Sequence, residues 1–149
     1  MSLRSKLVNS IFLAVQRVLN LKGNIGGLQS RYHATKGRIL RIYITDVDKY
    51  ASFKIEKGKI RMVSGVEASA TVSFDVATLL DLLKGKIKIP AQDGSHYWEQ
   101  YTPFDAWRRG ELSVKSDNDE CWLSDLSLFG RELYAEAFPV IREEFGGND

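Results

Sequence analysis

The chain has 149 residues, a net charge of +2 and a single cysteine. A chain of this length buries about 70% of the surface that its unfolded state exposes, so we expect one domain over residues 1–149 with no disulfide framework. The small net charge excludes bulk nucleic-acid binding, the longest apolar run is far too short to span a membrane, and the lone cysteine favours a cytoplasmic location.

Charge is distributed unevenly along the chain. Residues 1–45 carry eight basic residues and no acid, whereas the rest carries 13 basic and 19 acidic residues, a net of −6. Such asymmetry indicates a charged partner or self-complementary packing.

The first predicted element is an amphipathic helix over about residues 5–20, followed by a glycine-rich connection. The same helix carries an apolar stripe and the basic residues Arg4, Lys6 and Arg17. Near an anionic membrane each basic charge contributes on the order of 1 kcal/mol, so the helix could dock weakly on such a surface. The alternatives are that the stripe packs permanently on the domain, or that the segment is a mitochondrial transit peptide.

Three strands come next, over residues 38–45, 50–56 and 59–63, each with apolar residues at every second position. The tight turn at Lys57-Gly58 and the short connections predict an antiparallel meander. A fourth strand over 69–74 runs directly into a helix. Asp75 is the expected N-cap of that helix, worth roughly 1 kcal/mol over alanine, and Gly85 is the expected C-cap.

One face of the sheet and one face of this helix must therefore share an apolar layer. Whether that layer is solid core or a lined cavity stays open at this stage.

Residues 86–102 have the least regular pattern and form an aromatic insertion that contains His96, Tyr97, Trp98 and Tyr101. We expect a loop there. Pro103 predicts the start of a short helix that ends at Gly110, and a fifth strand follows over 111–115.

The last region, about residues 120–145, has the spacing of helices. Acidic residues at 117–120 favour its start through the helix dipole, and we expect Pro139 to break or kink its last turns. Trp107 and Trp122 lie on apolar faces, which predicts that both belong to the core.

Two stretches resemble the sterol-carrier-protein-2-like lipid-binding family: residues 79–87 (LLDLLKGKI) and residues 103–115 (PFDAWRRGELSVK). The resemblance covers about residues 38–129. It implies an α+β fold, in which helices cover one face of a mixed, mostly antiparallel five-stranded sheet and enclose an apolar tunnel. This chain departs from the family pattern at Ser116-Asp117, where Gly-Asp is usual, and in the insertion, which adds about a dozen residues.

The resemblance also implies a ligand, namely a fatty acyl chain, a sterol or an isoprenoid-like lipid. The residues that would line the tunnel are apolar and come from the strands and helices just described, with Trp98 at the tunnel mouth. They are Ile42, Phe53, Met62, Val72, Phe74, Leu80, Leu83, Trp107, Leu112 and Phe129.

No pattern of catalytic or cofactor-binding residues accompanies this apolar layer. His33, His96 and Cys121 supply three metal ligands at most and lack ligand spacing, so no metal site and no cofactor are expected. Cys121 and His96 would have to act as nucleophile and base in an enzyme, but a buried thiol beside Trp122 is the simpler interpretation.

The sequence therefore predicts a non-catalytic protein that binds or transfers an apolar ligand. An alternative is an accessory interaction module of a lipid or quinone biosynthesis complex, with the insertion at 86–102 as the contact for a protein partner. A small enzyme that uses Cys121 and His96 is the third interpretation.

Overall fold

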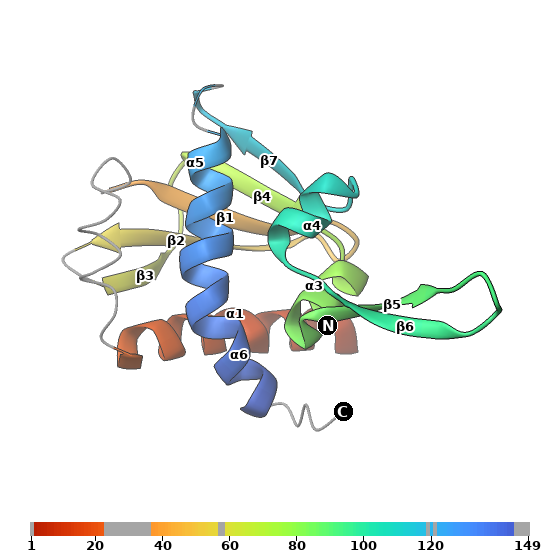
Figure 1. Cartoon of the computed structure of the whole chain (residues 1–149). Coiled ribbons are helices and arrows are strands. Elements are labelled where there is room, and N and C mark those ends of the chain that lie inside the picture. Colours follow the sequence, from red (N-terminus) through yellow and green to blue (C-terminus); the bar gives the residue numbers. More distant parts are fainter. Residues whose placement is uncertain (1, 23–36, 57–58, 119, 121, 145–149) are drawn as a thin grey trace.

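A five-stranded mixed sheet with helices packed on one face organises the computed structural model, as the sequence predicts (Figure 1). The structure describes residues 2–22, 37–56, 59–118, 120 and 122–144. Its elements, in chain order, are α1 (Leu3–Lys22), β1 (Ile39–Ile44), β2 (Lys49–Glu56), β3 (Lys59–Val63), β4 (Ala70–Phe74), α3 (Val76–Lys84), β5 (Lys86–Pro90), β6 (His96–Gln100), α4 (Pro103–Arg108), β7 (Ser113–Ser116), α5 (Trp122–Ser127), the π-helical stretch η3 (Leu128–Tyr134) and α6 (Ala135–Glu144).

The strand order in the main sheet is β3-β2-β1-β4-β7. The predicted meander is confirmed, since β1 pairs antiparallel with β2, and β2 with β3. The connection from β3 to β4 crosses over, so that β4 lies parallel to β1, and β7 then closes the edge antiparallel to β4. Buried and half-buried residues alternate along β1 and β4, and the buried ones face the helices.

Helix α3 begins and ends where its capping residues predict. Asp75 Oδ1 accepts a hydrogen bond from the Thr78 backbone N–H at 2.8 Å. Gly85 adopts the left-handed conformation with φ of 77°, and its N–H donates to the Asp81 carbonyl at 2.8 Å. Both ends of this helix are therefore determined by local sequence, which fixes the buried face formed by Val76, Leu79 and Leu82.

Helix α1 packs against β2, β3 and α6, and its apolar stripe is core. Packing of the stripe on the domain, one of the three possibilities open from the sequence, is the arrangement observed. The buried residues of the stripe are Val8, Ile11, Phe12, Ala14, Val15, Val18 and Leu19.

The C-terminal helical region runs continuously from α5 through η3 into α6. Of the break or kink expected at Pro139, the break is wrong, because α6 continues through Pro139 to Glu144. A proline inside a helix costs about 3 kcal/mol in helix propensity. Ala137, Phe138 and Ile141 are all buried around it, and their packing outweighs that cost.

The insertion at 86–102 is a β-hairpin, so the expectation of a loop is also wrong. Strands β5 and β6 pair antiparallel as a separate two-stranded sheet that projects from the body of the domain (Figure 1). The signal was the alternation Lys86-Ile87-Lys88-Ile89, followed by the turn pair Asp93-Gly94. The hairpin tolerates proline at position 90 because this residue ends a strand in a two-stranded sheet, where its missing N–H removes little hydrogen bonding between strands.

Candidate functional site

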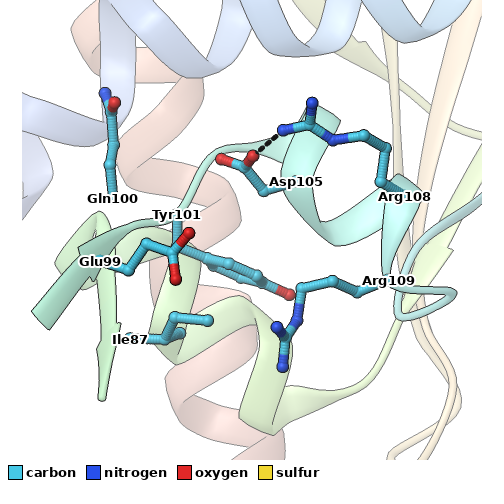
Figure 2. A pocket seen from close by; sticks show the side chains of 7 residues that line it. All are labelled: Ile87, Glu99, Gln100, Tyr101, Asp105, Arg108 and Arg109. Carbon is cyan, nitrogen blue, oxygen red and sulfur yellow. Dashed lines mark hydrogen bonds and ion pairs between the residues drawn. The ribbon is translucent and has the colours of Figure 1, made fainter. Parts of the chain in front are cut away.

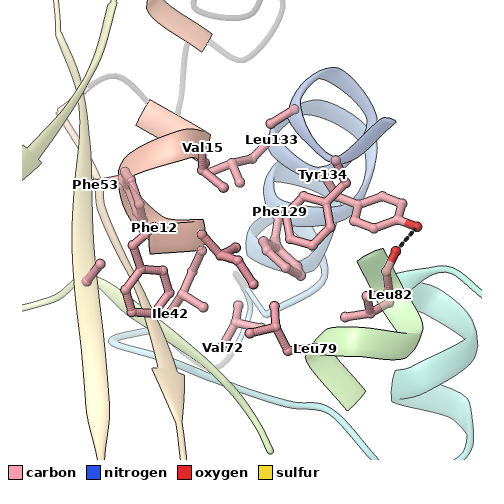
Figure 3. Packing of buried hydrophobic residues seen from close by; sticks show 14 of the residues in the cluster. Phe12, Val15, Ile42, Phe53, Val72, Leu79, Leu82, Phe129, Leu133 and Tyr134 are labelled. Atoms are coloured by element: carbon pink, nitrogen blue, oxygen red, sulfur yellow. Dashed lines mark hydrogen bonds between the residues drawn. The ribbon is translucent and has the colours of Figure 1, made fainter. Parts of the chain in front are cut away.

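The apolar layer between the sheet and the helices is the first candidate site (Figure 3). Phe12 and Val15 enter it from α1, and Leu79 and Leu82 enter it from α3. The ring of Phe129 in η3 lies between two others, with centroids 5.9 Å from Phe74 and 6.5 Å from Phe138. Elements from both ends of the chain thus meet over the centre of the sheet.

Most of the candidate tunnel residues lie in or beside this layer. Six are no more than 3% exposed: Ile42, Phe53, Val72, Phe74, Leu112 and Phe129. Met62, Leu80 and Leu83 are partly buried at its margin. The six buried side chains belong to the cluster of buried hydrophobic residues that forms the layer.

Two of the candidate residues lie outside the layer. Trp98 is 53% exposed on β6, with Lys86 Nζ and Lys88 Nζ 4.6 and 5.7 Å from its ring. Trp107 is 40% exposed and stacks on Trp122 with centroids 5.0 Å apart. The expectation that Trp107 belongs to the core is wrong, because the short helix α4 turns Pro103 and Ala106 inward and Trp107 outward.

A pocket of about 240 Å³ lies at the base of the hairpin, beside α4 (Figure 2). Tyr101 is buried there, and its hydroxyl donates to Glu111 at 2.7 Å. Burial and the Glu111 carboxylate raise the pKa of Tyr101 well above its usual range, so the phenol stays protonated.

Glu111 also accepts a hydrogen bond from Arg109 Nε at 2.9 Å, while Asp105 pairs with Arg108. Burial of Asp105 opposes its ionisation, but hydrogen bonds from Thr102 and Arg108 hold the pKa of this carboxyl below its usual value. Four charges around this pocket are therefore paired, and the network joins the hairpin to α4.

A larger groove of about 490 Å³ lies on the other side of Tyr101, between α4 and the C-terminal helical region. Phe104 and Pro139 contribute apolar walls, and Arg131 and Arg142 contribute positive charge. The residues of this groove are far apart in the sequence, and no motif predicted it.

An ion pair fastens the C-terminal helical region to the sheet. Arg38 donates from Nε and Nη2 to the two carboxylate oxygens of Asp125, both at 2.9 Å. Asp125 is 1% exposed and also accepts from Ser116. Burial lowers the pKa of Arg38, but its hydrogen bonds to Asp125 and Asp117 more than offset that and raise it.

Two of the basic residues of α1 have acidic partners in the folded chain. Arg4 lies 3.6 Å from Asp46, and Arg17 pairs with Glu144. Lys6 is exposed. Most of the apolar stripe is buried, although Leu3 and Leu13 of α1 are exposed, and docking of Arg4, Lys6 and Arg17 on an anionic membrane stays a prediction.

Reactive groups do not gather around the apolar layer in the described part of the chain. No group of three or more His, Cys, Asp or Glu residues that could hold a metal occurs among the described residues. His96 is exposed on the hairpin, whereas His33 and Cys121 lie outside the described residues. In the same ranges, none of the helices has the length and hydropathy to cross a membrane.

Comparison with known proteins supports the resemblance seen in the sequence. The family model described as the SCP-2 sterol transfer family matches residues 21–92, which confirms that resemblance. Among curated proteins, none matches the chain.

Three solved structures share the fold over most of their length. A crystal structure of sterol carrier protein 2 is 20% identical, with a TM-score of 0.54, and covers 87% of this chain and 94% of its own. A structure titled UbiJ-SCP2 ubiquinone synthesis protein is 15% identical, with a TM-score of 0.51, and covers 84% of this chain and 96% of its own. Sterol carrier protein 2 from Yarrowia lipolytica in its apo form is 11% identical, with a TM-score of 0.50, and covers 85% and 88%.

Proposed function

We propose, from the match to the SCP-2 sterol transfer family and the sterol carrier protein 2 fold, that this protein binds or transfers an apolar ligand without catalysis. The ligand class is a fatty acyl, sterol or isoprenoid-like lipid. The family match over residues 21–92 carries the proposal, and the apolar layer between the sheet and the helices supports it.

The layer suits such a ligand because its walls belong to different elements. Side chains fill it at Ile42, Val72 and Phe129, so a ligand must displace them as it enters. Leu80 and Leu83, at the half-buried margin of α3, are the proposed entry side. The work of separating the helices from the sheet lowers the observed affinity relative to a preformed cavity.

Displacement of a fluorescent fatty-acid probe tests this proposal. We expect the protein to bind the probe at micromolar concentration and Leu80→Gln to weaken binding about tenfold or more, because burying a leucine contributes about 1.5–3 kcal/mol. Ala77→Gln, at an exposed position of the same helix, is the matched control and should bind as the natural chain does. Absence of probe binding, or equal loss in both variants, would contradict the proposal.

A second candidate function, an accessory interaction module, is favoured by the hairpin. Tyr97 and Trp98 are 51% and 53% exposed on β6, and aromatic residues are enriched where proteins bind one another. One structure of the same fold carries a title that names a ubiquinone synthesis protein. A protein partner that contacts the hairpin is compatible with lipid binding in the layer, because the two regions are separate.

Shortening the hairpin distinguishes the two functions. Ile87 and Glu99 are direct partners in the β5–β6 register, so Asn-Gly in place of residues 88–98 joins them by a tight turn. Tyr101, which is buried, stays in place. If the module interpretation holds, the variant loses partner proteins on purification and keeps probe binding, whereas the exposed turn variant Gln92→Ala keeps both. Retention of the partners by the shortened protein would exclude the hairpin as their contact.

A further inference from the structure

We propose that the groove of about 490 Å³ between α4 and the C-terminal helical region is a second binding site, for an anionic amphiphile. The ligand class is a carboxylate or phosphate on a short apolar stem. The groove has the volume of a small-molecule site, and it lies outside the packed layer to which the proposed function assigns the lipid.

The groove is positively charged. Arg131 and Arg142 both line it, and none of its lining residues is acidic. Among the described residues neither arginine has an acidic partner: Arg142 Nε donates to the Leu83 carbonyl at 2.6 Å, and the Arg131 guanidinium lies 5.7 Å from the Phe104 ring centroid. These contacts hold the two guanidinium groups in position and leave their charge uncompensated.

Asp105 of α4, whose charge bears on Tyr134 in the groove, is already neutralised. Its carboxylate accepts hydrogen bonds from Thr102 and pairs with Arg108. An anion in the groove therefore meets two positive charges and no unpaired carboxylate from α4.

Apolar rings form part of the walls of the groove. Gly130 lets the Phe104 ring lie against η3, since a Cβ at this position would come 2.8 Å from Phe104 Cε2. The Tyr134 hydroxyl donates to the Leu82 carbonyl at 2.7 Å, which leaves the tyrosine ring as part of the wall. Phe104, Tyr134 and Pro139 thus form apolar walls beside the arginines.

The ligand class follows from these two features together. Arginine binds carboxylate and phosphate groups through paired N–H donors and remains charged at all physiological pH values. Apolar walls favour an alkyl or isoprenoid stem over a bare anion. A fatty acid and a lipid phosphate share this chemistry, so both must be tested.

Titration of isotope-labelled protein with octanoate, octyl phosphate, octanol and inorganic phosphate tests the site. We expect the first two to shift the backbone amide signals of Gly85, Thr102 and Gly130, and octanol and inorganic phosphate to bind at least tenfold more weakly. Removing one charged hydrogen-bonding group costs about tenfold or more, so Arg131→Gln should weaken both anions by that factor and leave octanol unchanged. Arg61→Gln, at an exposed position of β3, is the control and should have no effect.

Each contrary outcome overturns the second site, and none of them contradicts the proposed function. Equal affinity for inorganic phosphate and octyl phosphate would show a simple anion site. Octanol as tight as octanoate, or an unchanged affinity in Arg131→Gln, would remove the arginines from recognition. Shifts confined to Val72 and Leu79 would place the amphiphile in the layer, which would support the proposed function and contradict the second site.

Discussion

Replacing Arg38 with alanine should lower the free energy of unfolding by about 3–5 kcal/mol, the usual cost of leaving a buried charge without its partner. Asp125 is 1% exposed and receives two hydrogen bonds from the Arg38 guanidinium. In Arg38→Ala the Asp125 carboxylate keeps, among the described side chains, the Ser116 hydroxyl as its hydrogen-bond donor. Urea unfolding followed by circular dichroism measures the loss.

Two controls separate this effect from the loss of any surface ion pair. Arg17→Ala breaks an exposed pair with Glu144 and should cost less than about 1 kcal/mol. Arg38→Met combined with Asp125→Leu removes both charges and should recover most of the loss, since a buried pair is often replaceable by apolar residues. A cost below about 1 kcal/mol for Arg38→Ala would mean that Asp125 is solvated.

Replacing Phe129 with alanine should lower the free energy of unfolding by about 3–5 kcal/mol, because it removes a fully buried ring and leaves a cavity. The same cavity adds room to the layer. Phe129→Ala should therefore bind the fluorescent fatty-acid probe at least as tightly as the natural chain, at a temperature where both are folded. Thermal or urea unfolding and probe titration together test the prediction.

Trp98→Ala is the matched control for an aromatic residue on the exposed hairpin, and its cost should stay within about 0.5 kcal/mol. A cost below about 1 kcal/mol in Phe129→Ala would show that the ring borders open space in solution. Loss of probe binding in a folded Phe129→Ala protein would instead indicate that the Phe129 ring contacts the bound ligand.

The parts of the fold that could be predicted are those with local signals. The alternation in β4, the carboxylate of Asp75 and the left-handed Gly85 define the strand-to-helix unit within 17 residues, and the structure agrees with each. The hairpin at 86–102 also has a local signal, the alternation of lysine and isoleucine, but the cluster of aromatic residues that follows is equally typical of a functional loop. Trp107 was misplaced because a six-residue helix offers too few turns to fix its inner face.

The parts that could not be predicted depend on contacts between distant residues. Arg38 and Asp125 are 87 positions apart, and Arg17 meets Glu144 across 127. The groove combines Arg131 and Arg142 from the C-terminal helical region with Gly85 and Phe104, which are distant from them in the sequence. The candidate tunnel residues came from the family resemblance, and whether their layer is filled depends on side-chain volumes that periodicity does not encode.

Native mass spectrometry of protein purified from cells tests the central claim, binding of an apolar ligand, most directly. We predict a population with added mass that organic extraction removes and that lipid analysis identifies as a fatty acyl, sterol or isoprenoid-like compound. A clean mass of the chain alone, together with no binding of the fluorescent fatty-acid probe at micromolar protein, would contradict the claim.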